Sequence, residues 1–225
     1  MSRLHGLYVI TDSQLLADDD ALLLGVEAAI AGGASVVQYR DKSADQAKRL
    51  RQSRALLNLC RKHGVPLLIN DDVALAVEIG ADGVHLGLDD ATLFEARERL
   101  GKQAIIGVSC YNQLALAQQA EQGGADYVAF GRFFSSNTKP NAVQASRELL
   151  LEAKQQIGVP IVAIGGITPE NGGPLVATQA DMLAVIHGVF AQADICTAAQ
   201  NYTELFQNPK IRARRISNDA ITQSI

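Results

Sequence analysis

Short runs of β-branched and other apolar residues alternate with longer stretches of helical spacing along most of this chain. Buried strands appear in a sequence as short apolar runs, whereas helices appear as longer periodic stretches, so the alternation predicts repeated strand–helix units. The helical stretches span residues 21–32, 44–63, 73–79, 91–100, 112–123, 143–157 and 193–206. The eight expected strands lie at residues 7–10, 36–37, 67–69, 84–86, 105–108, 127–130, 161–164 and 183–186.

Strands that alternate with helices form a parallel sheet whose two faces must both be covered. Eight units in 225 residues average about 28 residues each, which suits a TIM barrel, a fold of typically about 250 residues. A doubly wound open sheet usually has a Gly-x-Gly-x-x-Gly motif after its first strand. Here Thr11, Asp12 and Ser13 follow the first strand instead. We therefore predict an α/β chain with one domain, a (β/α)8 TIM barrel over residues 1–207.

The last part of the chain, residues 208–225, has a different composition. It carries Lys210, Arg212, Arg214 and Arg215 and then a polar stretch. Chain ends of this kind are commonly frayed, which is the interpretation we favour. The alternative is a basic arm that contacts a neighbouring subunit of a homo-oligomer.

Charge and composition narrow the classes of partner. A net charge of −4, no tryptophan and 5% aromatic residues argue against a general nucleic-acid binder, which needs a basic face and stacking platforms. The sequence contains no run of 18 apolar residues, so no membrane span is expected. The chain starts without a signal-peptide pattern, and its three cysteines are too scattered for a disulfide framework. We therefore expect a cytoplasmic protein that acts on small molecules.

Active sites of TIM barrels lie at the carboxyl ends of the strands. The second expected strand ends with Gln38, Arg40 and Lys42 on one face, because side chains alternate along a strand. An arginine can bind phosphate with two hydrogen bonds, and lysine adds a compact charge, so this face favours an anion site. The alternative is a surface ion pair with Asp41 or Asp45.

The third and fourth strands each end in a pair of carboxylates, Asp71 with Asp72 and Asp89 with Asp90. Carboxylates and substrate phosphates are the ligands that Mg²⁺ prefers, which predicts a magnesium site. An aspartate after a strand is also a common helix N-cap, so one member of each pair fits that role. We assign Asp72 and Asp89 to structure and Asp71 and Asp90 to metal, a choice that spacing alone leaves nearly even. His85 is interpreted as a hydrogen-bonded residue of the pocket wall.

The fifth and sixth strands add further polar groups. Ser109 can donate a hydrogen bond to a phosphate oxygen, and nothing in the sequence marks Cys110 as activated. Lys139, after the sixth strand, has two interpretations. A Schiff-base aldolase uses a desolvated barrel lysine, but Lys139 lies between a polar segment and Pro140 and is better interpreted as a charged lid residue.

The loops after strands seven and eight form the usual monophosphate site of TIM barrels. Gly165 and Gly166 permit close backbone approach, Thr168 suits a helix N-cap, and His187 adds a donor. The sequence thus predicts a monophosphate site beside a second, metal-assisted site suited to a diphosphate. No general base or activated nucleophile stands out, so the combination indicates transfer of a group from a diphosphate to a monophosphate substrate.

These residues resemble the thiamine-phosphate synthase family over nearly the whole chain. Each matching segment is weak alone, but the ordered set, with each segment at an expected strand end, is specific. The matching segments are residues 7–12, 37–42, 69–71, 80–87, 107–109, 124–128, 137–139 and 163–167.

The resemblance implies that 4-amino-5-hydroxymethyl-2-methylpyrimidine diphosphate loses pyrophosphate to give a carbocation. The nitrogen of 4-methyl-5-(2-phosphoethyl)thiazole, or of its carboxylated form, then attacks to give thiamine phosphate. Asp71 and Asp90 match the Mg²⁺ ligands, and Arg40, Ser109 and Lys139 match residues expected to act in catalysis. The implied contacts to the pyrimidine diphosphate are Gln38, Tyr39, Arg40, Asp41, Lys42, Asn70, Ser109 and Lys139. Those to the thiazole phosphate are Ser136, Asn137, Thr138, Gly166, Ile186 and His187.

The chain departs from the family pattern at a few positions. Leu88 replaces a frequent Gln, and Ser136 and His187 replace a Thr and a Ser. Arg132 and Ser135 replace common prolines. These changes bear on affinity more than on the reaction. Two other functions stay open, a thiazole tautomerase-like paralogue and a non-catalytic sensor of thiamine precursors, although neither needs a diphosphate and metal cluster.

Overall fold

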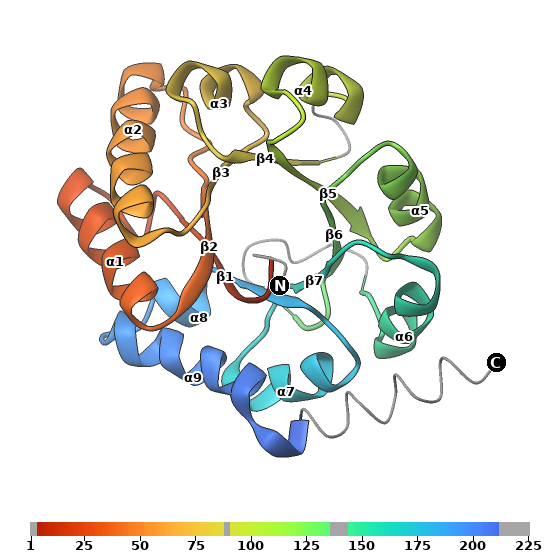
Figure 1. Ribbon diagram of the computed structural model, residues 1–225. Helices are drawn as coiled ribbons and strands as arrows, with labels where there is room; N and C mark the ends of the chain where they lie inside the picture. The colour runs from red at the N-terminus through yellow and green to blue at the C-terminus, as the bar shows by residue number, and fades with distance from the viewer. Residues whose placement is uncertain (1–3, 88–90, 136–143, 212–225) are drawn as a thin grey trace.

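Eight parallel strands close into a barrel in the computed structural model, which describes residues 4–87, 91–135 and 144–211. Each strand pairs with its neighbours in sequence, and β8 pairs with β1 to close the ring (Figure 1). The predicted (β/α)8 barrel is thereby confirmed. The strands are β1 (Gly6–Ile10), β2 (Ala34–Tyr39), β3 (Leu67–Asn70), β4 (Gly83–Leu86), β5 (Ile105–Tyr111), β6 (Tyr127–Gly131), β7 (Ile161–Ile164) and β8 (Met182–Val185).

Helices follow the strands and form an outer ring around the barrel (Figure 1). The short helix expected at residues 73–79 is present with those bounds, and the other expected helices differ by a few residues at their ends. No residue range was predicted for the helices at Pro169–Ala177 and His187–Phe190. The helices are α1 (Asp19–Ala31), α2 (Gln46–His63), α3 (Val73–Ile79), α4 (Leu93–Leu100), α5 (Leu114–Gln122), α6 (Arg147–Gln156), α7 (Pro169–Ala177), α8 (His187–Phe190) and α9 (Ile195–Gln207).

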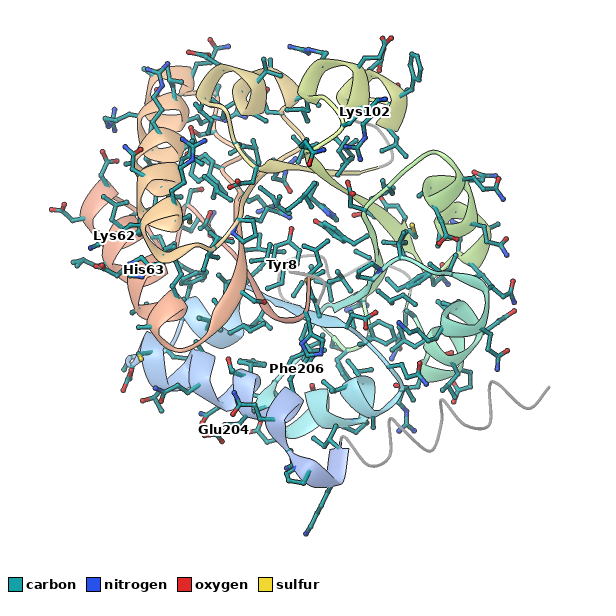
Figure 2. All side chains as sticks on the ribbon, viewed as in Figure 1. Tyr8, Lys62, His63, Lys102, Glu204 and Phe206 are labelled. Atoms are coloured by element: carbon teal, nitrogen blue, oxygen red, sulfur yellow. The ribbon has the colours of Figure 1, made fainter. Side chains whose placement is uncertain are left out.

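Side chains that alternate along the strands build two separate cores. One set, which includes Val9, Val37 and Ile69, packs outward against the helices. The other set, which includes Tyr8, Leu68 and Val162, fills the barrel interior. Figure 2 shows Tyr8 within the ring of strands. Because the interior is filled in this way, ligands have access only at the ends of the strands.

Helix starts are set by the capping residues that sequence patterns favour. Asp18, Asp45, Asp72 and Asp194 each accept a hydrogen bond from a backbone N–H in the first turn of the helix that follows. Asp72 was expected to serve structure in this way, and its carboxylate lies 2.9 Å from Leu75 N. The caps fix where each helix begins and therefore the length of each loop at the barrel mouth.

The last helix, α9, packs against α1 and α7 and ends at Gln207. Beyond this helix end, Ile211 still packs against the core, so the expected boundary at residue 207 stays a prediction. Most of the basic tail, residues 212–225, lies outside the described residues. Within the ranges that are described, no helix is both long enough and apolar enough to cross a bilayer.

Candidate active site

Three polar side chains on β2 and the loop after it rise from the barrel interior to its mouth. Gln38 is buried, Arg40 is half-buried, and the Lys42 side chain is 60% exposed. Lys42 pairs with the carboxylate of Asp71 on the loop after β3. Among the described residues, none forms an ion pair or a side-chain hydrogen bond with the Arg40 guanidinium. Arg40 therefore presents a cation at the mouth that no residue in the described ranges neutralises.

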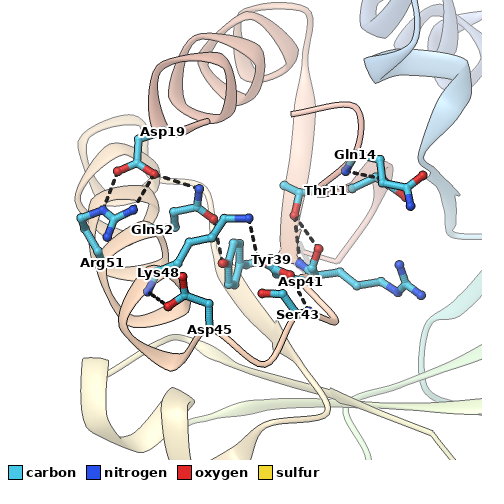
Figure 3. A network of polar contacts seen from close by, with 12 residues as sticks. Thr11, Gln14, Asp19, Tyr39, Asp41, Ser43, Asp45, Lys48, Arg51 and Gln52 are labelled. Atoms are coloured by element: carbon cyan, nitrogen blue, oxygen red, sulfur yellow. Dashed lines mark hydrogen bonds and ion pairs between the residues drawn. The ribbon is translucent and has the colours of Figure 1, made fainter. Parts of the chain in front are cut away.

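Tyr39 and Asp41 alternate in sequence with Gln38, Arg40 and Lys42, and their side chains lie on the opposite side of the strand and its loop (Figure 3). The Tyr39 hydroxyl donates to Gln52 Oε1 on α2 at 2.9 Å. Asp41 accepts from Ser43 N at 2.7 Å and pairs with Lys48 Nζ at 3.1 Å. Strand alternation therefore turns both side chains toward α2, which disfavours a side-chain contact of Tyr39 with the substrate, whereas Asp41 also lines the cavity described below.

Asp71 occupies a backbone conformation that non-glycine residues rarely adopt, with φ of 63°. Its backbone N–H donates to His85 O at 2.9 Å, and its carboxylate accepts from Asn70 Nδ2 at 2.5 Å and from Lys42. Strained backbone of this kind persists where the surrounding structure holds it, and it clusters at functional sites. The carboxylate is thus held at the mouth, with 23% of the side chain exposed.

A cavity of about 460 Å³ opens beside these residues, between the loops after β2 and β3, Ala91 before α4, and Arg99 in the last turn of α4. Three cations line it, Lys42, Arg49 and Arg99, together with aspartates 41, 71 and 72. Arg49 Nη2 pairs with Asp72 Oδ2 at 2.7 Å, so this aspartate is already neutralised. The remaining wall is formed by Ser43, Asn70, Val73, Ala74 and Ala91. The cavity is large enough for a small phosphorylated molecule.

Beneath the mouth, a chain of hydrogen bonds crosses the barrel interior from β2 to β5. Gln38 Nε2 donates to the Tyr8 hydroxyl, which lies 2.9 Å from the Tyr127 hydroxyl. Tyr127 lies 2.8 Å from His85 Nδ1, and His85 Nε2 lies 2.9 Å from Ser109 Oγ. His85 is thus a hydrogen-bonded residue of the wall, as expected. The sequence reasoning missed Tyr8 and Tyr127, although both occupy inward-facing strand positions where a purely apolar residue would be ordinary.

Burial keeps both inner tyrosines protonated. It raises the pKa of each hydroxyl, Tyr8 and Tyr127, well above the ordinary value for tyrosine. Burial also raises the pKa of the Cys110 thiol to about 12, which agrees with the expectation that this cysteine is not activated.

The loop after β7 supports the described ends of the loop after β6. Gly165 O accepts from Phe134 N at 2.9 Å, and a Cβ at Gly166 would lie 2.3 Å from Ser135 O. Asn171 Nδ2 donates to Gly166 O at 3.0 Å, which orients this peptide. Thr168 is the N-cap of α7 and Pro169 its first residue, as the sequence predicted.

The eighth strand ends one residue earlier than expected, since Ile186 is the N-cap of α8 rather than a strand residue. His187 is exposed and begins α8, and Val189 and Phe190 donate backbone hydrogen bonds to Ile186 O. The loops after β7 and β8 thus have backbone geometry compatible with the expected monophosphate site.

Several expected site residues lie outside the described residues. They are Asp89 and Asp90 after β4, and Ser136, Asn137, Thr138 and Lys139 after β6. Within the described residues, Lys42, Asn70 and Asp71 contact one another and line the cavity. Gln38 and Ser109 are joined only through Tyr8, Tyr127 and His85, and Arg40 follows the end of β2.

Comparison with known proteins identifies the family. A family model described as thiamine monophosphate synthase matches residues 7–189. A thiamine-phosphate synthase of Nitrosococcus oceani is 52% identical over 205 residues, 91% of this chain and 94% of the relative. One from Marinobacter nauticus is 53% identical over 203 residues, covering 89% of this chain and 90% of the relative.

Solved structures agree with this result. A thiamine phosphate pyrophosphorylase from Pyrococcus furiosus superposes with a TM-score of 0.82 at 32% identity, covering 93% of this chain and 97% of that one. A 3-hexulose-6-phosphate synthase, 16% identical with a TM-score of 0.66, shares the fold alone. From the family match and the identity to these relatives, we conclude that the chain belongs to the thiamine monophosphate synthase family.

Proposed function

We propose that this enzyme condenses 4-amino-5-hydroxymethyl-2-methylpyrimidine diphosphate with 4-methyl-5-(2-phosphoethyl)thiazole, or its carboxylate, to give thiamine phosphate and pyrophosphate, with CO2 also released when the carboxylate is the substrate. The observation that carries the proposal is the cationic mouth, where Arg40 has no described protein partner and Lys42 and Asn70 surround Asp71. A diphosphate is the substrate group that such a cluster stabilises.

In this proposal the pyrimidine diphosphate contacts Gln38, Arg40, Lys42, Asn70, Ser109 and Lys139. Tyr39 and Asp41, whose side chains bond to α2, hold the loop between β2 and α2 in place. The thiazole phosphate contacts Ser136, Asn137, Thr138, Gly166, Ile186 and His187. The exposed His187 and the oriented Gly166 peptide support this second assignment.

We assign Mg²⁺ to Asp71 and Asp90. Asp71 suits this role, because it offers carboxylate oxygens at the mouth and its left-handed backbone is held in place by His85 and Asn70. Asp90 lies outside the described residues. When bound, a divalent cation supplies positive charge next to the diphosphate oxygens. Lys42, which pairs with Asp71 in this structure, is positioned to bind the same anion.

The proposed reaction is dissociative. The bond between the pyrimidine methylene carbon and the diphosphate oxygen breaks, and its electron pair leaves with pyrophosphate. The thiazole nitrogen then donates its lone pair to the methylene carbon to form the new C–N bond. Arg40, Lys42, Ser109 and Lys139 stabilise the charge that develops on the leaving group. No proton must be removed for this step, which suits a mouth in which the sequence reveals no general base.

Because both substrates are charged phosphates, we place the reaction in the cytoplasm, where such metabolites are retained. A tautomerase-like paralogue or a non-catalytic sensor would not need Arg40, Lys42 and Asp71 at one mouth. A second copy of the chain as partner stays a proposal that rests on the basic tail.

The test mixes purified protein with both substrates and Mg²⁺ and measures thiamine phosphate and pyrophosphate. We expect equal amounts of the two products, and their absence would refute the proposal. Asp71→Ala and Lys139→Ala should each lower turnover far more than they lower the melting temperature. A matched loss of both properties would assign that residue to structure instead.

A further inference from the structure

The hydrogen-bonded chain inside the barrel connects two proposed substrate contacts that do not touch each other. Gln38 lies at one end on β2 and Ser109 at the other end on β5, and Tyr8, Tyr127 and His85 join them. Tyr8 and Tyr127 are 119 residues apart in sequence and are 1% and 0% exposed. These two side chains are too buried to touch a substrate at the mouth.

Counting the protons along this series of hydrogen bonds shows which group donates and which accepts at each step. The structure turns the Gln38 amide nitrogen toward Tyr8, and in this orientation the amide can only donate, so the Tyr8 oxygen accepts. Both phenols keep their single proton, because burial raises the pKa of each. The described residues offer the Tyr8 proton no acceptor except Tyr127, so Tyr127 must in turn donate to His85 Nδ1. His85 then carries its proton on Nε2 and donates to Ser109 Oγ.

This order of donors and acceptors fixes the hydrogen-bonding roles of the two end residues, Ser109 and Gln38. Ser109 receives a hydrogen bond from His85, so its own hydroxyl proton is available to donate toward the mouth. Gln38 uses its amide N–H on Tyr8, and no described residue hydrogen-bonds to its carbonyl oxygen. In the reverse order Ser109 would donate to His85 and Gln38 would accept from Tyr8. Ser109 would then present only lone pairs to an anionic diphosphate, which is repulsive.

We propose that Tyr8, Tyr127 and His85 are positioning residues that fix Ser109 as a hydrogen-bond donor toward the diphosphate and Gln38 as an acceptor toward the amino group of the pyrimidine. The inference rests on the proposed function, which supplies the substrate contacts. A buried hydroxyl left without a hydrogen-bond partner destabilises the fold, because its desolvation is not compensated. The closed barrel interior thus holds the chain in one direction before substrate arrives, and the substrate does not have to reorient it.

Packing supports the same assignment. The Tyr127 ring stacks on the His85 ring with centroids 5.7 Å apart and meets the Tyr8 ring edge-on at 5.9 Å. Gly107, next to His85 in the sheet, leaves the space that the Tyr127 ring fills, since a Cβ there would lie 1.9 Å from its Cζ. These contacts hold the three rings in the geometry that the hydrogen bonds need.

The first experiment measures the protonation of the His85 ring by nitrogen–proton correlation NMR of the substrate-free protein. His85→Gln identifies the signals of this residue among the four histidines of the chain. We expect a neutral ring with its proton on Nε2 and a bare Nδ1. A ring with its proton on Nδ1 would overturn the proposal. This readout needs no activity, so it stands apart from any failure of the proposed function.

The second experiment is a double-mutant cycle between residues that do not touch. Tyr127→Phe and Ser109→Ala are measured singly and together as kcat/KM for the pyrimidine diphosphate. We expect each single change to lower kcat/KM at least about 10-fold and the double variant to be little worse than Ser109→Ala, since both remove the same donor. Full additivity of the two losses would overturn the proposal.

Tyr202→Phe is the matched control. It also removes a fully buried hydroxyl, which donates to Ile167 O at 2.9 Å, but it lies on α9 outside the chain of hydrogen bonds. When Tyr202→Phe is combined with Ser109→Ala, the two losses in kcat/KM should be additive. In Tyr202→Phe the His85 ring proton should stay on Nε2. If no variant or wild-type protein turns over the substrates, the proposed function fails, whereas the NMR result still decides the direction of the chain.

Discussion

Gly107 is the residue whose small size sets the geometry under the active-site mouth. It lies on β5 opposite Tyr127, whose ring atoms would be 1.9–2.3 Å from a Cβ at this position. Backbone conformation does not require glycine here, because no positive φ is recorded for it. The requirement is space for a ring that carries two hydrogen bonds.

Gly107→Ala should therefore displace the Tyr127 ring. We expect a loss of roughly 1–3 kcal/mol in the free energy of unfolding, as for other overpacked cores, together with a fall in kcat/KM. Urea denaturation and steady-state kinetics measure the two effects. Gly173→Ala is the control, because a Cβ there meets only the end of the Ile211 side chain at 3.2 Å. A stable and fully active Gly107→Ala would contradict the packing argument.

Arg40 illustrates the opposite case, a residue whose loss should cost activity and little stability. Its guanidinium has no ion pair among the described residues. Arg40→Ala should lower kcat/KM for the pyrimidine diphosphate by about 10²-fold, as for loss of one preorganised donor, and leave the melting temperature nearly unchanged. Arg54→Ala, which removes an exposed pair with Glu78 on the outer surface, should leave kinetics unchanged. Equal kinetic effects of the two changes would remove Arg40 from the site.

At the scale of single elements, the loop between β2 and α2 positions Arg40 and Lys42. Asp41, whose side chain is 1% exposed, ties this loop to α2 through Lys48 and closes a turn with Ser43. Burial alone would raise the pKa of Asp41, but the hydrogen bonds from Ser43 and Lys48 outweigh it and hold the pKa below the ordinary value. The carboxylate is thus more favourable in the folded than in the unfolded chain.

The sign of this shift gives a pH prediction. A lowered pKa stabilises the fold at pH values above the unfolded value of about 3.9, and this contribution is lost as the pH falls through the lower folded value. Asp41→Asn should reduce the free energy of unfolding by about 1–3 kcal/mol near pH 7. Its difference from wild type should shrink below about pH 3.9. Urea titrations at several pH values measure this, with the exposed Asp20→Asn as control. If the difference in unfolding free energy stays constant across the whole pH range, the ionised Asp41 carboxylate does not stabilise the loop between β2 and α2.

Strand alternation predicted Gln38, Arg40 and Lys42 on one face of β2, and the buried, half-buried and exposed series in the structure agrees. The same rule places Tyr39 and Asp41 on the opposite face. The expectation that they contact substrate came from matching residues 37–42 to the family as one segment. The hydrogen bond of Tyr39 to α2 disfavours this contact, whereas for Asp41, which lines the cavity, it stays a prediction. Helix starts were predictable for a similar reason, since an aspartate before a helix forms its cap within three residues.

The series of hydrogen bonds from Gln38 to Ser109 could not be predicted from local sequence pattern. Its direction depends on contacts between side chains of five strands, β1, β2, β4, β5 and β6. Only closure of the barrel brings Tyr8 next to Tyr127. The strand count predicted the closure, but not which inward side chains would meet, because that depends on the stagger between strands.

At the scale of the whole molecule, the mouth collects one or two groups from each of several strands, so ligand binding should stabilise the barrel as a unit. A ligand at 100 times its dissociation constant adds about 2.7 kcal/mol to the free energy of unfolding. For a chain of this size each kcal/mol corresponds to roughly 2–4 °C in melting temperature. Saturating pyrophosphate with Mg²⁺ should therefore raise the melting temperature by roughly 5–11 °C.

The prediction separates metal-assisted binding from simple charge attraction. With a chelator present, pyrophosphate should raise the melting temperature much less, because the cations alone must then balance its charge against the carboxylate of Asp71. Asp71→Asn should lose most of the metal-dependent increase while keeping the smaller metal-independent one, since Arg40 and Lys42 remain. Calorimetry on wild type and variant, with and without Mg²⁺, measures all four values. If pyrophosphate stabilises the wild type equally with and without the metal, Asp71 does not hold Mg²⁺ and instead only orients Lys42.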